Sequence, residues 1–502
     1  MKIAPPDSAV DTLLPAVADF LTAPKMVIGG ETVASASGET FAVYNPATGK
    51  ELARVPAGGA EDVDRAVKAA QAAFEGPWSK MLPAQRQGLM LKLADLIEAH
   101  GEELAQLETL NNGKSIMLSR LIEVTASAEY FRYMAGWATK ITGSTLDVSI
   151  PIPPGMRYQA YTRKEPVGVV AAITPWNFPL NMASWKIAPA LAVGCTIVLK
   201  PAEETPLTSI RLAQLALEAG IPAGVVNVVT GMGEATGAPL VAHPGIAKIA
   251  FTGSTETGKL IGVQAMKDMK RVTLELGGKA PMVMFDDMDL DLLGVAAGIG
   301  SFFNTGQTCC SGVRIYAQSG IYEKALEVIT NITRSLSIGS GLDPRHQINP
   351  VVSARHQAHV KSCIARGIEQ GAKPMICASA PEDGFFVAPE VFTDVRQDMA
   401  LMQDEVFGPV ISVTPFTDED AAIRMANDTR FGLGASIWTT DLNKMMKYVP
   451  RLQAGTVWVN SHNIPDQNMP FGGMKQSGIG REHGAGAVEN YLETKSVCIA
   501  YR

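Results

Sequence analysis

The hydrophobic positions of the chain follow two different spacings, and each spacing predicts one type of secondary structure. Residues 61–140 are rich in Ala, Leu, Glu and Lys, and apolar positions such as Ala66 and Ala70 recur at helical intervals. Prolines in residues 147–154 then break the pattern, and a strand-like alternation follows at residues 158–162. Residues 61–140 are therefore predicted to be mainly helical.

Short β-branched runs then alternate with helical stretches in units of about 30 residues. This alternation is typical of βαβ units, which place their strands in a parallel sheet. After Gly277 and Gly278 the alternation starts again, which predicts a second α/β domain. The predicted strands are residues 167–173, 196–199, 225–229 and 248–252 in the first region and 281–285, 313–317, 410–415 and 456–459 in the second.

Two predicted strands, residues 158–162 and 496–500, have no obvious partner in either region. An unpaired strand exposes a row of backbone N–H and C=O groups that can pair with another strand. We expect these two strands to pair with each other or with another subunit, and we therefore expect an oligomer.

The composition is that of a multidomain protein that binds small molecules. A chain of 502 residues is too long for one ordinary hydrophobic core, so two or three domains are expected. Hydrophobic residues make up 46% of the chain and charged residues 19%, which is a globular balance. The formal net charge of -7 argues against a surface for nucleic acid or for an anionic membrane.

Cysteine use and the lack of a targeting signal predict a cytoplasmic protein. The six cysteines form no pair or cluster with zinc-ligand spacing, so we expect a reducing compartment and no metal site. Asp11 and Asp19 interrupt the apolar stretch near the N-terminus, which makes it a poor signal peptide. The longest apolar run, residues 188–199, is shorter than the roughly 20 residues of a membrane-spanning helix.

Two glycine-bearing segments carry little functional information. Residues 229–237 follow a predicted strand and resemble a dinucleotide fingerprint, but Gly237 comes one residue late. A plain strand-to-helix turn is therefore the favoured interpretation. Residues 478–480, which contain two glycines, are interpreted as a turn as well.

A third segment, residues 251–259, is a better candidate for binding a phosphate. Its glycine and lysine spacing is that of a P-loop, but Leu260 stands where that motif requires a magnesium-binding Ser or Thr, so ATP binding is rejected. A strand that leads through Gly253 and Ser254 into a helix still aims backbone N–H groups at a phosphate.

Residues 302–314 contain the candidate nucleophile. Cys309 and Cys310 follow small and polar residues and precede a strand-like run. A cysteine in an apolar setting is usually a small core residue. Here the small polar surroundings leave a core role and a reactive role about equally plausible, and other segments of the chain decide between them.

Those segments resemble the aldehyde dehydrogenase superfamily in order and spacing over essentially the whole chain. They are PWNFP at 175–179, LKPAE at 199–203, LELGGK at 274–279 and EVFGP at 405–409, together with the 251–259 turn and the Cys309 segment. Residues 150–168, 452–462 and 469–480 most resemble the group of this superfamily that acts on phenylacetaldehyde.

The resemblance implies an α/β fold of the aldehyde dehydrogenase type. Residues 1–145 and 167–277 would form a Rossmann-type NAD-binding domain, and residues 278–478 an α/β catalytic domain. Residues 146–166 and 479–502 would form a small β arm for oligomerisation. A homo-oligomer is implied, with a tetramer favoured over a dimer.

The resemblance also implies catalysis through a thioester. An aldehyde is a poor hydride donor until a nucleophile such as a thiolate forms an oxyanion beside the C–H bond. Cys309 matches the nucleophile, with Cys310 as the alternative. Asn177 and the Cys309 N–H would hold the oxyanion, Glu275 would activate water, and Glu482 would relay protons. Without the resemblance, Asn177 would be interpreted as a turn residue and the glutamates as surface or helix-end charges.

The implied cofactor is NAD. Lys200 and Glu203 would hold the adenine ribose, where a carboxylate repels the 2′-phosphate of NADP. Ser254 would contact the pyrophosphate. Glu405 and Phe407 would lie at the nicotinamide ribose, whose hydroxyls can donate hydrogen bonds to a carboxylate. The full predicted cofactor set is Thr174, Trp176, Lys200, Glu203, Gly253, Ser254, Leu276, Glu405 and Phe407.

The expected partner is a small aldehyde that enters through an apolar tunnel. Such a tunnel suits an arylacetaldehyde, with aliphatic, betaine or retinal-like aldehydes as alternatives. A non-catalytic protein on the same scaffold is disfavoured because Cys309 and Glu275 are both present. The predicted tunnel residues, which could equally be plain core, are Phe178, Met182, Trp185, Phe303, Thr308, Ile464 and Phe471.

Overall fold

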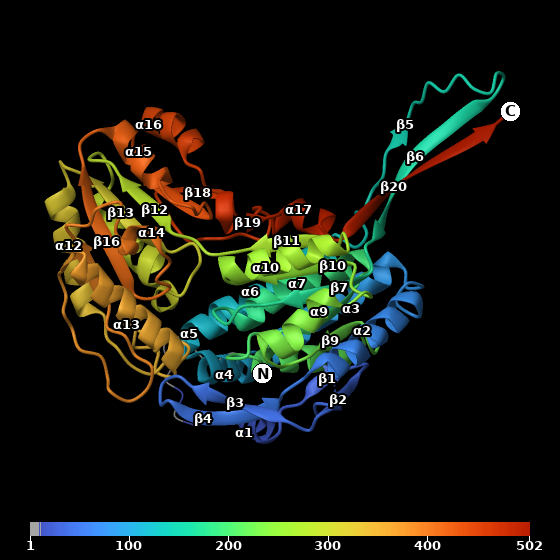
Figure 1. The fold of residues 1–502 in the computed structure, drawn as a ribbon, viewed down its shortest axis with the longest axis horizontal. Coiled ribbons are helices and arrows are strands. Elements are labelled where there is room, and N and C mark those ends of the chain that lie inside the picture. The colour runs from blue at the N-terminus through green and yellow to red at the C-terminus, as the bar shows by residue number, and fades with distance from the viewer. Residues whose placement is uncertain (1–9, 11) are drawn as a thin grey trace.

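The computed structural model describes residue 10 and residues 12–502, which form two mainly parallel sheets, the helices that cover them and a projecting β arm (Figure 1). The α/β fold class is therefore confirmed. Across residues 12–502, no helix is both long enough and apolar enough to cross a membrane.

The first sheet has eight strands in the order β19-β11-β10-β7-β8-β9-β1-β2. The five central strands run parallel, and β1, β2 and β19 are antiparallel additions at the edges. The strands are β1 (Met26–Ile28), β2 (Glu31–Val33), β7 (Val169–Ile173), β8 (Thr196–Lys200), β9 (Val226–Val228), β10 (Lys248–Thr252), β11 (Arg271–Glu275) and β19 (Gly478–Ile479).

The strand order of this sheet reverses next to β7. From β7 the chain passes to β8 and β9 on one side and then returns to β10 on the other side. In open α/β sheets, ligands bind at the carboxyl ends of the strands where the order reverses. Residues 174–178 follow β7 at this end, and residues 253–254 follow β10.

The interpretation of residues 478–480 as a turn was wrong for the first two of them. Gly478 and Ile479 form β19, which pairs antiparallel with the end of β11. Gly478 has a φ of 142°, and a Cβ there would lie 2.0 Å from the carbonyl oxygen of Leu274. The close approach of two backbones, rather than a change of direction, is the reason for glycine at this position.

The second sheet has seven strands in the order β14-β15-β16-β13-β12-β17-β18, all parallel except for β14. The predicted second α/β region is thus confirmed. The strands are β12 (Ala280–Met284), β13 (Gly312–Gln318), β14 (Lys373–Pro374), β15 (Glu390–Thr393), β16 (Val410–Phe416), β17 (Gly434–Trp438) and β18 (Thr456–Val459).

Helices cover both faces of the first sheet. Val63, Ala66 and Ala70 pack α2 on one face together with α9 and α10, as the helical spacing predicts, while α3, α4, α6, α7 and α8 pack on the other. The first-half helices are α1 (Pro15–Thr22), α2 (Ala60–Glu75), α3 (Pro83–Ala99), α4 (Gly101–Asn112), α5 (Ile116–Leu118), the π-helix η1 (Ser119–Thr125), α6 (Ala126–Ala135), α7 (Pro179–Val193), α8 (Leu207–Glu218), the π-helix η2 (Gly233–Gly237), α9 (Ala238–Ala242) and α10 (Thr255–Lys267).

The remaining helices pack mainly around the second sheet. They are η3 (Leu290–Leu292), α11 (Leu293–Val295), the π-helix η4 (Ala296–Phe302), η5 (Phe303–Gly306), α12 (Tyr322–Ser335), α13 (Ala354–Glu369), α14 (Ala400–Gln403), α15 (Glu419–Asn427), α16 (Leu442–Tyr448), η6 (Val449–Arg451), η7 (Lys475–Ser477) and α17 (Gly484–Glu489). Of these, α17 instead contacts α7 beside the first sheet.

The two strands without an obvious partner pair with each other. β6 (Arg157–Pro166) and β20 (Leu492–Tyr501) form an antiparallel ladder along their full length, and β5 (Thr145–Leu146) adds a short third strand. This arm extends away from both large sheets (Figure 1). A separate hairpin, β3 (Thr40–Asn45) and β4 (Lys50–Pro56), lies near α1 and α4.

Candidate active site

A cavity of about 850 Å³ collects residues from both sheets. Its walls come from the loops after β7, β10 and β11 and from the loops before β13 and β16. The predicted residues that line it are Trp176, Asn177, Phe178, Met182, Trp185, Gly253, Ser254, Glu275, Leu276, Phe303, Thr308, Cys309, Glu405, Phe407, Ile464, Phe471 and Glu482. Thr174, Lys200 and Glu203 are not among its lining residues.

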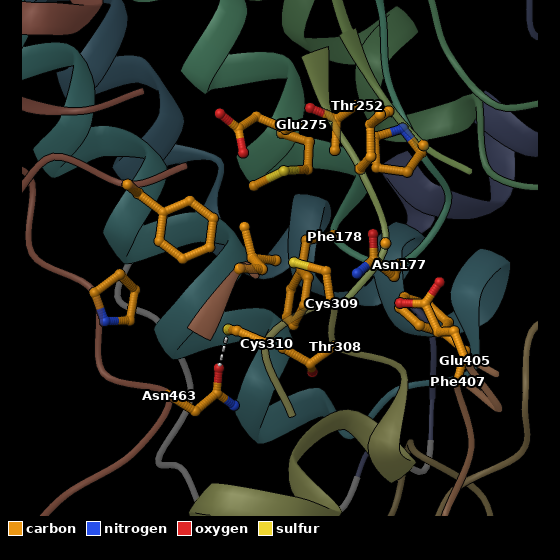
Figure 2. A pocket seen from close by; sticks show the side chains of 18 of the residues that line it. Asn177, Phe178, Thr252, Glu275, Thr308, Cys309, Cys310, Glu405, Phe407 and Asn463 are labelled. Atoms are coloured by element: carbon orange, nitrogen blue, oxygen red, sulfur yellow. Dashed lines mark hydrogen bonds between the residues drawn. The ribbon is translucent and has the colours of Figure 1, made fainter. Parts of the chain in front are cut away.

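The two neighbouring cysteines differ in their surroundings. Cys309 is half-buried and its sulfur points into the cavity, whereas Cys310 is buried and its thiol donates to Asn463 Oδ1 at 2.9 Å (Figure 2). The thiol of Cys310, together with burial, raises the pKa of Cys309 well above its usual range. A cysteine in this state needs a base to remove its proton before it can act as a nucleophile.

The turn that presents Cys309 has an unusual backbone. Asn304 and Thr305 adopt φ values of 50° and 57°, and Gly306 adopts 73°. A Cβ at Gly306 would lie 2.2 Å from the carbonyl oxygen of Gly408, so this loop packs backbone against backbone. Such strained positions persist only where the surroundings hold them in place.

Asn177 is fixed beside the cysteine loop. Its side-chain Nδ2 donates to the backbone carbonyl oxygen of Gln307 at 3.0 Å. The backbone carbonyl oxygen of Asn177 accepts from Asn304 Nδ2 at 3.0 Å. An amide nitrogen carries two hydrogens, so one remains for a group in the cavity. Figure 2 shows this amide close to the Cys309 side chain.

A buried lysine, which sequence reasoning missed, supports the same loop. Lys114 donates to the carbonyl oxygen of Asn177 at 2.7 Å, pairs with Glu123, and lies 4.4 Å from the centre of the Phe178 ring. Glu123 belongs to the π-helix η1 and also accepts from the backbone N–H of Asn181 at 2.8 Å. Only the fold brings these groups together, because 63 residues separate Lys114 from Asn177.

Glu275 ends β11 inside the cavity wall. It is 4% exposed, and neither carboxylate oxygen makes a hydrogen bond to any described residue. Burial, and then the charge of Glu482, raises the pKa of Glu275 well above its usual range. A buried carboxyl with a raised pKa and free lone pairs is suited to accept a proton from a thiol or from water.

Glu482 pairs with a second buried lysine that the sequence did not single out. Lys186 of α7 contacts Glu482 Oε1 and also donates to Thr252 Oγ1 at 2.7 Å. The other carboxylate oxygen of Glu482 is buried and has no hydrogen-bond partner within residues 12–502. Glu482 lines the same cavity as Glu275, and its charge acts on Glu275. Residues 479–502 had been predicted to belong to the arm. The predicted domain boundaries themselves stay a prediction.

Glu405 occupies the opposite wall and is held by the backbone. Its Oε1 accepts from the N–H of Gly278 at 2.8 Å, and a Cβ on Gly277 would lie 2.4 Å from its Oε2. Burial raises the pKa of Glu405 to about 7. The two glycines after β11 are therefore needed for close contact with this carboxylate.

Phe407 follows with a φ of 57° and packs edge-on against Trp176, with 5.2 Å between ring centres. Two histidines of α13, which sequence reasoning missed, brace this loop. His356 Nε2 lies 2.7 Å from the carbonyl oxygen of Phe407, and His359 Nε2 lies 3.4 Å from that of Glu405. Burial lowers the pKa of His356 to about 4, so it is neutral and donates to Phe407.

The features around the strand ends fit a dinucleotide. At the end of β8, Lys200 Nζ lies 3.1 Å from Glu203, and the hydroxyl of Thr174 after β7 is buried without a partner in the described chain. Ser254 caps α10, and its hydroxyl accepts from the N–H of Thr257 at 3.2 Å. The first residues of this helix line the cavity, so its amino end faces the cavity. Within residues 12–502, no cluster of three or more His, Cys, Asp or Glu residues could hold a metal ion.

Aromatic side chains form the rest of the cavity. Phe178 stacks on Phe303 with 6.0 Å between ring centres, and Trp185 meets Phe471 edge-on at 5.6 Å. Ile464 is half exposed at the rim. Lining residues that sequence reasoning missed include Ile122, Ala126, Tyr130, Asn463 and His483.

Comparison with known proteins identifies the family. Residues 32–497 match the aldehyde dehydrogenase family, and the chain belongs to that family. It is 52% identical to phenylacetaldehyde dehydrogenase from Pseudomonas fluorescens over 98% of this chain and 99% of that protein. It is 43% identical to retinal dehydrogenase 2 from Gallus gallus over 95% of this chain and 91% of the relative.

A solved structure supports the same assignment. The NAD+ complex of aldehyde dehydrogenase from Bacillus cereus is similar with a TM-score of 0.94 and 47% identity, covering 99% of this chain and 100% of that one. The resemblance found in the motifs and the predicted aldehyde dehydrogenase-like fold are thus confirmed.

Proposed function

We propose that the protein uses NAD to oxidise an arylacetaldehyde of the phenylacetaldehyde type to the carboxylic acid. The observation that carries this proposal is the arrangement around Cys309. A half-buried thiol, the amide of Asn177 and the unpartnered carboxyl of Glu275 line one cavity with aromatic walls. These are the nucleophile, oxyanion donor and base that acyl chemistry needs.

The cofactor would lie along the carboxyl ends of β7, β8 and β10. Glu203 would accept hydrogen bonds from the hydroxyls of the adenine ribose, where its charge disfavours the 2′-phosphate of NADP. Glu405 would accept hydrogen bonds from the hydroxyls of the nicotinamide ribose. The α10 amino end at Ser254 would receive the pyrophosphate. The similar Bacillus cereus structure was solved with NAD+. When bound, NAD accepts the hydride of the substrate.

The first step forms a bond between Cys309 and the aldehyde. Glu275 takes the thiol proton, the sulfur attacks the carbonyl carbon, and the C=O electron pair becomes an oxyanion. The second N–H of Asn177 and the backbone N–H of Cys309 donate to that oxyanion. Loss of the hydride from this thiohemiacetal leaves a thioester on Cys309.

The second step releases the acid. Glu275, whose carboxylate oxygens have no partner among the described residues, first gives up the proton that it took from the thiol. It then removes a proton from water while the water oxygen adds to the thioester carbon. The C–S bond breaks, the carboxylic acid leaves, and the sulfur departs as a thiolate that takes back the proton held by Glu275, so the thiol is restored. Glu482 and Lys186 form the buried ion pair through which the proton is passed onward.

The substrate class rests on the aromatic walls and on the relatives. Phe178, Phe303, Trp185 and Phe471 offer flat apolar surfaces to a ring, and the Pseudomonas fluorescens relative is a phenylacetaldehyde dehydrogenase. Broad activity on aliphatic or other aldehydes is the second candidate, since retinal dehydrogenase 2 is also similar.

We further propose a homo-oligomer in the cytoplasm, with a tetramer favoured. The arm leaves the short β5 and the far edge of β20 open to further strands. On α10, Leu260, Val263 and Met266 are 73%, 67% and 52% exposed, which is a typical subunit-contact stripe. All six cysteines are free, as in proteins of a reducing compartment.

The test is NADH formation with phenylacetaldehyde, hexanal, betaine aldehyde and retinal, each with NAD and with NADP. We expect the highest kcat/KM with phenylacetaldehyde and NAD. Mass spectrometry of acid-quenched enzyme should find the acyl group on Cys309. Equal kcat/KM for hexanal and phenylacetaldehyde would contradict the substrate, and an acyl group elsewhere or nowhere would contradict the mechanism.

A further inference from the structure

Four aromatic side chains form one part of the cavity wall, beside Glu482. The Trp185 ring lies 4.0 Å from the His483 ring and 6.2 Å from the Tyr130 ring, measured between centres. Tyr130 and His483 are 5.0 Å apart, and Phe471 closes the group at 5.6 Å from Trp185. They come from α6, α7 and the segment before α17, and all four line the cavity.

Two polar atoms in this apolar group have no hydrogen-bond partner among the described residues. They are the hydroxyl of Tyr130, whose oxygen interacts weakly with the backbone of His483, and Nε2 of His483. Tyr130 is 1% exposed and His483 is 2% exposed. Burying a polar group without a partner costs free energy, so native proteins rarely leave two such atoms on neighbouring side chains. Their missing partner is therefore expected to come from outside the chain.

The protonation of both groups follows from their contacts. His483 Nδ1 lies 2.8 Å from the carbonyl oxygen of Asp466, which can only accept, so Nδ1 carries the hydrogen. Burial lowers the pKa of His483 to about 4, and the neutral ring leaves Nε2 as an acceptor. Burial raises the pKa of Tyr130 well above its usual range, so its hydroxyl stays a donor.

His483 is held in this orientation by its backbone. Its φ of 64° lies in the left-handed region, which a non-glycine residue adopts only where the surroundings require it. The carbonyl of Asp466 fixes one ring nitrogen and Trp185 packs against the ring. The free nitrogen therefore belongs to a fixed ring that lines the cavity and lies 5.0 Å from the Tyr130 ring, centre to centre.

We propose that Tyr130 and His483 recognise a hydroxyl group on the aromatic ring of the substrate. A hydroxyl is the group that can accept from Tyr130 and donate to Nε2 of His483 at the same time. The preferred substrates are then ring-hydroxylated arylacetaldehydes, of which 4-hydroxyphenylacetaldehyde carries its hydroxyl furthest from the carbonyl. This inference rests on the proposed function and names its substrate class more closely.

One alternative role for Tyr130 has a basis in the same region. Glu482 lies close enough for its charge to raise the pKa of Tyr130, and Oε2 of Glu482 also has no partner within residues 12–502. If Tyr130 served Glu482 through a water molecule, loss of its hydroxyl would slow the oxidation of every aldehyde alike. A role in recognition changes the ratio between hydroxylated and unsubstituted substrates instead.

The experiment compares kcat/KM for 4-hydroxyphenylacetaldehyde with kcat/KM for phenylacetaldehyde, with NAD saturating. The wild type is expected to prefer the hydroxylated substrate at least tenfold, because the unsubstituted ring leaves buried polar atoms unpaired. Tyr130→Phe and His483→Leu should each lower this ratio by about tenfold or more. The matched control is Tyr133→Phe, whose hydroxyl bonds to Asn468 at 2.9 Å outside the cavity, and it should keep the wild-type ratio.

Two results would overturn the inference. One is a wild-type ratio of one or below, and the other is an equal loss with both aldehydes in Tyr130→Phe. Failure of the proposed function looks different, because the wild type would then oxidise neither aldehyde. A direct readout that needs no turnover is the Kd of 4-hydroxyphenylacetamide, an unreactive analogue, which should rise about tenfold in Tyr130→Phe while that of phenylacetamide does not.

Discussion

Two walls of the cavity each carry a glutamate, the buried Glu275 and the half-buried Glu405, and the protein holds the two side chains differently. Glu405 is anchored by the N–H of Gly278 and lies against Gly277, which has no side chain to displace it. Glu275 is buried more deeply than the half-buried Glu405, yet both of its oxygens lack a hydrogen-bond partner among the described residues. Burial raises the pKa of both carboxyls.

This difference separates binding from chemistry. A group that holds a ligand in place gains from being fixed by the protein before the ligand arrives. A group that exchanges protons with a thiol and then with water must keep its lone pairs free for those partners. The same contrast holds for the cysteines, since Cys310 is bonded to Asn463 and Cys309 faces the cavity.

The largest expected effect is that of Cys309→Ala. Oxidation should fall by at least about 10⁴-fold, since no other group can form the thioester, while the Kd of NAD changes less than about threefold. Stopped-flow NADH formation and NAD titration measure the two quantities. Cys310→Ser, which keeps a donor toward Asn463, is the matched control and should still form the acyl adduct at residue 309. Acylation of Cys310 in the wild type would reverse the assignment.

Glu275→Gln should come next, with a loss of about 10²- to 10⁴-fold in steady-state turnover. If the thiol can still lose its proton to solvent, a burst of NADH of up to one equivalent precedes the slow phase, because thioester hydrolysis needs the base. In the wild type, hydrolysis should speed up as pH rises, since a raised pKa keeps Glu275 protonated at lower pH. A variant with an unchanged steady-state rate would rule out Glu275 as the base.

Asn177→Ala should lower kcat by about 10²- to 10³-fold, the usual cost of one oxyanion donor. KM for the aldehyde should change little, because the oxyanion exists only after the sulfur has attacked. The contrasting result, a higher KM with unchanged kcat, would mean that Asn177 binds the ground state only.

Gly277→Ala tests the cavity wall that carries Glu405. The new Cβ would lie 2.4 Å from Oε2 of Glu405 and must displace it, so KM for NAD should rise by about tenfold. Gly262→Ala on α10, whose Cβ would meet Leu274 at an ordinary 3.7 Å, is the control. An equal effect of both substitutions would show that Glu405 does not contact the cofactor.

The smallest effect concerns pH. The pKa of Glu405, raised to about 7 by burial, means that the carboxyl is neutral below that pH and charged above it. The charged form accepts ribose hydroxyls better, so KM for NAD should fall a few-fold as pH rises from 6 to 8. Glu405→Gln should raise KM for NAD and make it independent of pH over this range. A pH dependence that survives in this variant would belong to another group.

Much of the fold and part of the site could be predicted from local sequence. β-branched runs predicted β7 to β10 in the first sheet and β12, β13, β16 and β18 in the second, because hydrophobic period is a local property, but they missed β11, β15 and β17. The Cys309 segment and the four motif segments placed the site at the ends of those strands, and all four proposed catalytic residues line one cavity. The role of Gly478 was misjudged because a glycine needed for close backbone approach looks in sequence like one needed for a turn.

Other features depend on side chains that meet only in the folded chain. Lys114 under Asn177, Lys186 beside Glu482, and Tyr130 beside His483 join residues far apart in sequence, and none belongs to a local pattern. The sequence alone therefore determined the strands, the helices and the chemical type of the reacting groups, since these depend on residue identity and spacing. Tertiary structure decided which buried polar atoms have partners and which do not, because partners and desolvation depend on what packs around each atom.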